Sequence, residues 1–160
     1  MNEYLAAASY LPHSSPMVLV DEVIHVDDEH AHCRVAVSRE SILAPFLNAQ
    51  GHLPAWFGIE IIAQTIGVWS GWHGRQISGL QEKPRPGMLL GGRGYRCKQD
   101  NFPAGSLLDV TVTLLMRDDK IGSFEGEIAI AGETYASGRL NTYQPDEHEL
   151  KALLEQGKLL

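Results

Sequence analysis

The chain has 160 residues, of which 44% are hydrophobic and 21% are charged, the composition of an ordinary globular protein with a sizeable core. Its net charge of −7 argues against a general nucleic-acid binder, which needs a basic face. No run approaches the roughly eighteen apolar residues of a membrane span, and the first residues lack the basic region of a signal peptide. We therefore expect a cytoplasmic protein that binds neither nucleic acid nor membrane.

The first part of the chain predicts a pair of strands followed by a loop. Residues Met17–Val26 are rich in β-branched side chains, and the second half of His30–Ser38 alternates apolar and polar residues. The acidic turn at residues 27–29 separates the two segments, so we expect them to form a hairpin. Residues Arg39–Leu53 contain proline, asparagine and glycine, which is typical of a loop.

One long helix is predicted over about residues 54–73. Pro54 has the position that a first-turn proline favours, and the segment after it is apolar around nearly its whole circumference. The apolar positions are Trp56, Phe57, Ile59, Ile61, Ile62, Ala63, Ile66, Val68 and Trp69. A helix that is apolar on every side is normally buried on every side. We therefore expect a central helix that the rest of the chain wraps.

The second half of the chain supplies the strands that would wrap this helix. Turn signals at residues 101–105, 118–120 and 132 separate strand-like runs. The runs are Met88–Lys98, Leu107–Met116, Ser123–Ala131 and Glu133–Thr142. Strands joined by short turns, with one helix after the first pair, predict a single α+β domain over residues 1–160, in which an antiparallel sheet curls round the helix. The tail predicts a short helix over about residues 145–158.

Four segments stand out in order along nearly the whole chain. The first two read LPHSSPMVLVDEV from Leu11 and LPAWFGIEIIAQ from Leu53, and the last two read NFPAGSLLDVTVTL from Asn101 and SFEGEIAIAGETYASGRL from Ser123. Together they resemble the β-hydroxyacyl-acyl-carrier-protein dehydratases. The details GHLPAW and VWSGWH are most similar to a subgroup associated with aryl-polyene biosynthetic clusters. The resemblance implies a hotdog fold, and elimination of water from 3-hydroxyacyl thioesters in fatty acid or polyene-type lipid biosynthesis.

Glu60 is the strongest catalytic candidate. A carboxylate within so apolar a helix is expected to be desolvated, which raises its pKa. Such an acid suits dehydration, because the leaving hydroxyl is protonated while a proton is removed from the carbon α to the thioester carbonyl. The resemblance also places the acidic residue of the family's helix motif here. The alternative roles are a buried ion pair or a contact between subunits.

Three neighbours of Glu60 complete the predicted site. Gln64 lies one turn further along the same face, where it could orient the carboxyl group or a water, or form a helix–helix hydrogen bond. Ala55 stands where the resembling family has glycine, and its backbone N–H could polarise the substrate carbonyl. Trp56 is the candidate for an aromatic substrate contact, although a tryptophan on such a helix can equally belong to the core.

The catalytic histidine of the related dehydratases is missing from its motif. Counting back from the helix carboxylate by the family spacing reaches Phe46, and Gln50 stands where a second histidine often occurs. His52, the nearest titratable group in the same loop, is a candidate to take its catalytic role, and the alternative is a structural role. Asn48 could hydrogen-bond a water or a carbonyl, and His13 has the more ordinary role of fixing the N-terminal segment.

The remaining histidines and the cysteines predict neither a metal site nor a cofactor. His30 and His32 alternate on a strand without a supporting carboxylate or cysteine cluster. Cys33 and Cys97 stand apart in strand-like segments and are expected to be reduced, buried thiols. His73 lies near the predicted helix end and is expected to cap it.

Basic residues concentrate in one stretch of an otherwise acidic chain. They are Arg75, Lys83, Arg85, Arg93, Arg96 and Lys98. Such a patch would suit the phosphate and the acidic side chains of an acyl carrier protein or of coenzyme A, and the alternative is a solvated face.

Three functions are compatible with these residues. The first is a dehydratase in which Glu60 acts as acid and base. The second is a hotdog thioesterase, which also uses an acidic residue on this helix but needs no catalytic histidine. The third is a non-catalytic subunit that binds the acyl thioester and completes a partner's site. The resemblance implies a homodimer or a heterodimer with a related hotdog subunit.

Overall fold

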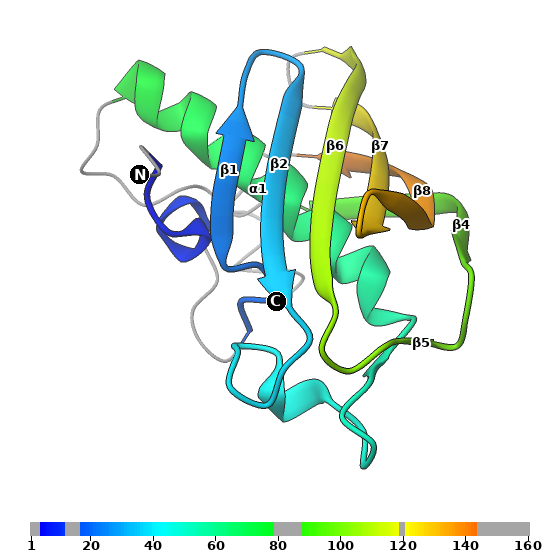
Figure 1. Ribbon diagram of the computed structural model, residues 1–160. Helices are drawn as coiled ribbons and strands as arrows, with labels where there is room; N and C mark the ends of the chain where they lie inside the picture. Colours follow the sequence, from blue (N-terminus) through cyan, green and yellow to red (C-terminus); the bar gives the residue numbers. More distant parts are fainter. Residues whose placement is uncertain (1–3, 12–16, 79–87, 119–120, 144–160) are drawn as a thin grey trace, which may run out of the picture.

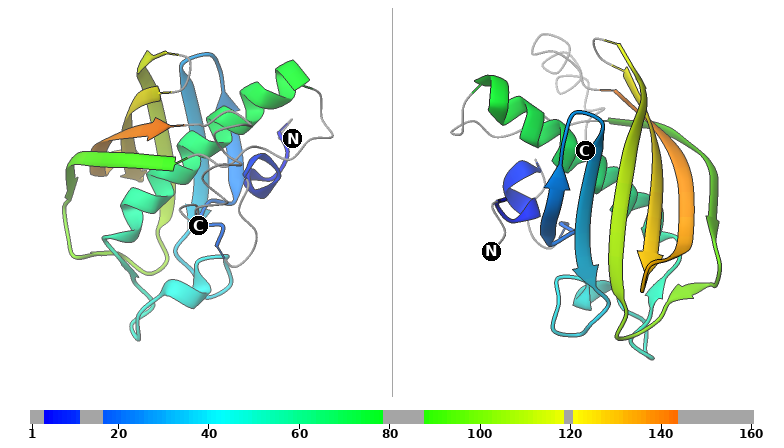
Figure 2. Two further views of the ribbon diagram at one scale, coloured as in Figure 1. Left: turned by 180° about the vertical axis from the view of Figure 1, so that it is seen from behind. Right: turned by 45° about the horizontal axis from the view of Figure 1, so that its top comes forward.

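The computed structural model describes residues 4–11, 17–78, 88–118 and 121–143. In this part of the chain, six antiparallel strands form one sheet in the order β1-β2-β6-β7-β8-β4 (Figure 1). Their bounds are β1 Glu22–Val26, β2 His30–Ala36, β4 Met88–Cys97, β6 Leu107–Arg117, β7 Ile121–Ile130 and β8 Glu133–Tyr143. The sheet curls round the side on which the one long helix, α1 (Phe57–Ser78), lies (Figure 2). This confirms the predicted α+β arrangement.

The shorter elements lie around the helix. The 3-10 turn η1 (Ala7–Tyr10) packs beside α1, so closely that a Cβ atom on Gly71 would lie 2.0 Å from the carbonyl oxygen of Tyr10. A second 3-10 turn, η2 (Ala44–Phe46), and the short pair of β3 (Leu53–Pro54) with β5 (Asn101–Phe102) lie at the end of the sheet where α1 begins (Figure 1).

Strand alternation builds the core between sheet and helix. Strands β2, β6 and β7 bury every second side chain, as expected for strands with one apolar face. These strand residues are Ala31, Cys33, Val35, Leu108, Val110, Val112, Phe124 and Ile128. The helix contributes Ile61, Ile62, Ile66, Val68 and Trp69 to the same core. At Gly126 the sheet and the helix touch, because a Cβ atom there would lie 2.3 Å from Cγ2 of Ile62.

The predicted helix bounds are wrong at both ends. Pro54 does not sit in the first helical turn; it belongs to β3 and pairs with Asn101, and the helix begins three residues later at Phe57. At the other end the helix continues to Ser78 rather than stopping near residue 73. No proline interrupts those residues, and a glycine alone, here Gly74, is tolerated inside a helix at modest cost.

The predicted strands are found close to their expected bounds, with one exception. The second strand and the four strands after the helix each begin and end within two residues of the prediction. The first strand begins only at Glu22, because Met17 and Leu19 hydrogen-bond to the helix rather than to a neighbouring strand. The predicted C-terminal helix and His13 lie outside the described residues.

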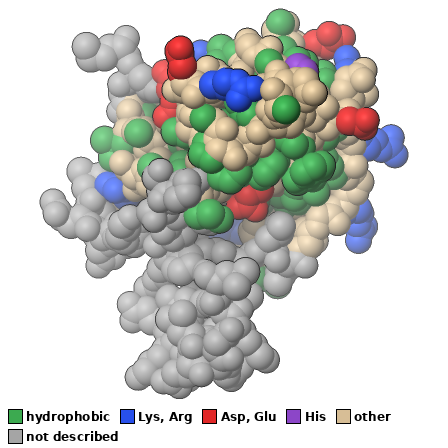
Figure 3. Space-filling model, turned by 90° about the horizontal axis from the view of Figure 1, so that it is seen from below, with side chains coloured by type: hydrophobic (Ala, Val, Ile, Leu, Met, Phe, Trp, Pro, Cys, Tyr) green, Lys and Arg blue, Asp and Glu red, His purple; other side chains and the backbone are tan. Residues whose placement is uncertain are grey.

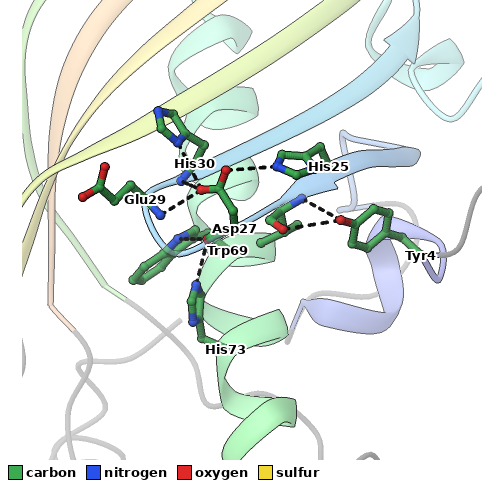
Figure 4. A network of polar contacts seen from close by, with 8 residues as sticks. Tyr4, His25, Asp27, Glu29, His30, Trp69 and His73 are labelled. Carbon is green, nitrogen blue, oxygen red and sulfur yellow. Dashed lines mark hydrogen bonds and ion pairs between the residues drawn. The ribbon is translucent and has the colours of Figure 1, made fainter.

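The carboxylate of Asp27 fastens the turn between β1 and β2. Its Oδ1 accepts the backbone N–H groups of Glu29 at 2.9 Å and of His30 at 2.8 Å, and ring nitrogens of His25 and His30 lie 3.0 Å from its two oxygens (Figure 4). The N–H of Glu29 and the imidazole of His25 are the main reasons why the pKa of Asp27 lies well below its usual range.

The backbone of Asp27 ties the same turn to the helix. Its carbonyl oxygen accepts the indole N–H of Trp69 at 3.1 Å, and Nε2 of His73 lies 3.0 Å from it (Figure 4). The expectation that His73 caps the helix is therefore wrong, because residue 73 lies before the end of α1 and its imidazole holds the hairpin to the helix.

No helix among the described residues is long and apolar enough to cross a membrane.

We predict that Asp27→Asn lowers the free energy of unfolding at neutral pH, and that this loss shrinks in strong acid. Folding depresses the pKa of Asp27, so the carboxylate stabilises the fold above the ordinary aspartate pKa of about 3.9 and this contribution is lost as pH falls through the lower folded-state pKa. Urea unfolding across that range measures the effect. Asp28→Asn, an exposed neighbour, is the control, and a difference that does not change with pH would contradict the prediction.

Gly126→Ala should destabilise the protein by about 1–3 kcal/mol, because the new methyl group meets the stiff branch of Ile62 in a packed core. The matched control is Gly74→Ala, whose Cβ would have nothing within 4 Å and which should be neutral or stabilising by up to about 1 kcal/mol. Denaturant titration gives both values. Equal effects from the two substitutions would be inconsistent with a close helix–sheet contact at Gly126.

Candidate functional site

Glu60 lies in the first turn of α1, and its side chain is exposed. The expectation of a buried carboxylate is wrong for the single chain, because the sheet covers the opposite side of the helix and leaves the beginning of α1 open. Trp56, just before the helix, is 68% exposed. Figure 3 views the molecule from the end where the helix begins, and apolar side chains gather over this face with acidic ones among them. The described part of this chain therefore leaves the Glu60 carboxylate open to solvent.

The amide of Gln64 connects Glu60 to the segment before β1. Its Oε1 accepts the backbone N–H of Leu19 at 2.7 Å, while its Nε2 donates to the carbonyl oxygen of Met17 at 2.7 Å and lies 3.4 Å from Oε1 of Glu60. Gln64 is only 2% exposed. Because one end of the amide must accept and the other must donate, its orientation is fixed, and its NH2 group points towards the carboxylate.

The backbone at Ala55 is occupied on both sides. Its N–H donates to the carbonyl oxygen of Asp100 at 2.8 Å, so it is not available to a substrate, and the expectation that it forms the oxyanion site is wrong. Its carbonyl oxygen accepts the N–H of Gly58 at 3.0 Å and the hydroxyl of Tyr95 at 2.6 Å. The peptide at the helix start is thus held in place by two segments, β4 and the residues before β5.

Tyr95 is a residue that sequence reasoning missed. Burial, with a smaller effect of Cys97, raises the pKa of its phenol, which therefore stays a neutral donor. A Cβ atom on Gly58 would lie 1.9 Å from the Tyr95 hydroxyl. The glycine in the segment WFGIE was the available signal, since a glycine in a helix often marks the close approach of another group.

An aromatic cluster borders the beginning of the helix. The ring of Phe46, at the position where the resemblance predicts a histidine, lies 5.3 Å from the ring of Phe57, and the ring of Trp56 lies 5.9 Å from that of Phe57. These side chains border the beginning of the helix and carry no titratable group. The described loop and helix start therefore present an apolar wall here.

Asn48 holds its own loop together, whereas His52 joins this loop to the turn after β5. Nδ1 of His52 accepts the backbone N–H of Ala104 at 2.8 Å, and the Oδ1 of Asn48 accepts the N–H groups of Gln50 and His52, each at 3.0 Å. Within the described residues, no hydrogen bond or ion pair joins His52 to the helix carboxylate. The structure therefore brings Gln64 to Glu60 but does not bring His52 or Asn48 into contact with it.

The basic residues of the predicted patch separate into different places. Arg93, Arg96 and Lys98 are exposed on or just after β4, whereas Arg75 lies at the end of α1 and donates to the carbonyl oxygen of Ser9 at 2.8 Å. Lys83 and Arg85 lie outside the described residues. Lys98 forms an ion pair with Glu133 at 3.0 Å.

The cysteines lie on different strands. Cys33 is buried in β2, where desolvation raises the pKa of its thiol to about 12, and Cys97 is half-buried in β4. No group of three or more His, Cys, Asp or Glu side chains in the described ranges could hold a metal ion.

An antiparallel sheet curled round one helix, with a carboxylate in the first helical turn, defines a hotdog-fold protein, and solved structures share this fold. A hypothetical thioesterase protein from Streptococcus pneumoniae, solved with coenzyme A, is 12% identical, has a TM-score of 0.57, and aligns over 77% of this chain and 86% of its own. At this identity the likeness shows the fold alone.

Closer relatives are dehydratases. A chain of the dehydratase heterocomplex ApeI:P from Xenorhabdus doucetiae is 54% identical, has a TM-score of 0.87, and aligns over 95% of this chain and 99% of its own. The 3-hydroxyacyl-[acyl-carrier-protein] dehydratase FabZ of Streptococcus pyogenes is 33% identical over 134 residues, 81% of this chain and 89% of that protein. The family model described as ApeP dehydratase matches residues 5–155, and the chain belongs to this ApeP-like family.

Gln64→Leu should lower the free energy of unfolding by about 1–3 kcal/mol, since it leaves the buried N–H of Leu19 and the carbonyl of Met17 without their partner. Urea unfolding measures the loss. Gln50→Leu is the control, because its side chain is exposed, and it should stay within about 0.5 kcal/mol of the wild type. If both substitutions have the same small effect, the amide of Gln64 does not hold the N-terminal segment on the helix.

Proposed function

We propose that this chain is one subunit of a two-chain dehydratase, to which it contributes Glu60 as the carboxylic acid and base. The imidazole comes from a partner hotdog subunit. This division is supported by a combination of two features: the Glu60 carboxylate at the helix start is exposed, and Phe46 stands where the resemblance predicts a histidine. A second subunit that covers the helix start would both desolvate Glu60 and bring the missing titratable group.

The comparisons support the substrate class. The family is one of dehydratases, the FabZ relative is named for 3-hydroxyacyl groups on an acyl carrier protein, and the relative with 54% identity belongs to a dehydratase heterocomplex. We therefore expect a 3-hydroxyacyl thioester on a carrier protein, within polyene-type lipid biosynthesis. The aryl-polyene assignment and the cytoplasmic location stay predictions from the sequence.

The reaction needs one group that takes a proton and one that gives it. A base removes a proton from the carbon α to the thioester carbonyl, the bond between Cβ and oxygen breaks, and an acid protonates the departing hydroxyl, so that an enoyl thioester and water are formed. Glu60 and the partner's imidazole would share these two tasks. Two groups on different chains can do this only when the interface brings one of them to the α proton and the other to the β hydroxyl of the same acyl chain.

Two further features of the helix start assist this step. Gln64 positions the carboxylate through its Nε2, whose direction the Leu19 and Met17 contacts fix. The N–H of Ala55 is already bonded to Asp100. The N–H groups of Trp56 and Phe57, at the positive end of the helix dipole, would therefore polarise the thioester carbonyl. The exposed Trp56 indole and the Phe46 ring would border the acyl chain.

Glu60→Gln should abolish most dehydration while leaving the two-chain complex intact. The amide keeps the size of the side chain but can neither give nor take the proton, so we expect at least about a hundredfold lower turnover. The assay mixes this chain, a partner hotdog subunit and a 3-hydroxyacyl carrier protein, and follows the loss of water by mass. Glu127→Gln, an exposed carboxylate on β7, is the matched control and should be fully active.

Three results would contradict the proposal. Undiminished turnover by Glu60→Gln would show that the Glu60 carboxylate takes no part in the reaction. Full turnover by the wild-type chain without any partner would show that it carries a complete site of its own. Release of free thiol without loss of water would instead indicate a thioesterase.

A further inference from the structure

A bulge in β4 turns the ring of Tyr95 towards the beginning of α1. The register with β8 shifts between Arg93 and Arg96, where three steps along β4 match two steps along β8. Gly94, with φ of +66°, takes up the extra residue. Arg93 and Arg96 are exposed on the outer face of the sheet, whereas Tyr95 between them is half-buried. The bulge therefore aims one side chain inward from a stretch whose neighbours face outward.

Two glycines make room for this inward ring. A Cβ atom on Gly138 of β8 would lie 3.2 Å from Cα of Tyr95 and 3.3 Å from its Cδ1. A Cβ atom on Gly58, in the first turn of α1, would lie 2.9 Å from Cζ of the same ring. Because neither neighbour carries a side chain, the ring can reach from the sheet to the helix start. The position of its hydroxyl is thus set by close packing at both ends of the residue.

The hydroxyl of Tyr95 fixes the plane of one peptide unit. The carbonyl oxygen of Ala55 accepts this hydroxyl at 2.6 Å and the N–H of Gly58 at 3.0 Å, so both of its lone pairs are used. A peptide unit is planar and almost always trans, so the N–H of Trp56, on the other side of the same unit, points away from both donors. Within the described residues, this N–H donates to no acceptor.

The same hydrogen bond makes the N–H of Trp56 a stronger donor. A donor on a peptide oxygen draws electron density towards that oxygen and leaves the N–H of the unit more positive. In condensed phases this cooperativity strengthens a hydrogen bond by about 10–30%. Burial raises the pKa of the Tyr95 phenol, which therefore keeps its proton and continues to donate. The N–H at the helix start thus has a fixed direction and an enhanced polarity.

We propose that Tyr95 is a positioning residue of the dehydration: its phenol orients and polarises the peptide between Ala55 and Trp56, whose N–H then donates to the thioester carbonyl. When the base takes the α proton, the electron pair of that C–H bond moves towards the carbonyl oxygen. It returns to form the double bond between Cα and Cβ as the protonated hydroxyl leaves as water. A donor already in place stabilises the charge on the carbonyl oxygen as it develops. This inference rests on the proposed two-chain dehydratase and adds to it a residue that touches no substrate atom.

The first experiment compares kcat with KM. Tyr95→Phe keeps the ring and removes the hydroxyl, and it should lower kcat about tenfold while KM changes by less than about twofold, because the lost polarisation acts mainly in the transition state. The assay mixes each variant with the ApeI chain of the Xenorhabdus doucetiae complex and a 3-hydroxyacyl carrier protein, and follows the loss of water by mass.

Tyr135→Phe is the matched control for this experiment. The Tyr135 hydroxyl also donates to a backbone carbonyl, that of Asn101 at 2.8 Å, in the strand that pairs with β3. Both variants should therefore lose stability to a similar degree in melting curves, but only Tyr95→Phe should lose kcat.

The second experiment measures the polarisation of the thioester carbonyl directly. A saturated acyl carrier protein with an isotopically labelled thioester carbonyl has no hydroxyl to lose, and infrared difference spectroscopy follows its carbonyl stretch on the two-chain complex. The wild type should move this band to lower wavenumber than in solution. Tyr95→Phe should lose much of the shift, whereas Tyr135→Phe and Glu60→Gln should keep it. A fluorinated tyrosine at position 95, whose phenol is a stronger donor, should move the band further down.

Three outcomes would overturn the inference. One is a carbonyl band that Tyr95→Phe leaves at its wild-type place. Another is a raised KM at unchanged kcat, which would indicate a role in binding alone. The third is an equal loss of kcat in Tyr135→Phe, which would give Tyr95 a structural role only. The proposed function fails by a separate result, undiminished turnover of Glu60→Gln, and a band that still moves with Tyr95 would then leave this inference standing.

Discussion

The apolar helix α1 must be covered along its length, and the curled sheet of one chain covers one side of it. The two are in close contact where Gly126 lets β7 approach Ile62, which is itself fully buried. Burial of these side chains, worth about 25 cal/mol for each Å² of apolar surface, is the main force that fixes the helix against the strands. The same geometry leaves the first turn of the helix, with Glu60, outside the cover. What the fold buries and what it leaves open both follow from this one contact.

Most of the fold could be predicted because it depends on periodicity. Alternation in the strands and the all-round apolar pattern of α1 are properties of the residues themselves, and both appear in the structure. The helix start could not be placed, because Pro54 has the φ angle that a first turn favours but also suits a short strand. Only the pairing of β3 with β5, from residues some fifty positions apart, decides between the two.

The site was predicted less completely than the fold, for the same reason. Glu60 and Gln64 share a helix face, which spacing alone reveals, and their contact at 3.4 Å confirms that the two lie together. The other candidate groups already form hydrogen bonds with distant segments. The N–H of Ala55 donates to Asp100, and Nδ1 of His52 accepts from Ala104. The imidazole of His73 contacts the carbonyl oxygen of Asp27. A sequence shows which groups can form hydrogen bonds, but not which of them are already satisfied.

The exposed carboxylate and strand β4 are joined by Tyr95. This residue lies within the bulge that sets Arg93 and Arg96 on the outer face, and its hydroxyl reaches inward to the carbonyl of Ala55, 2.6 Å away, at the beginning of the helix. Strand β4 and the turn that carries Glu60 are therefore held in a fixed relation. A partner subunit of the kind we propose would meet a carboxylate whose place relative to the sheet is already set by this chain.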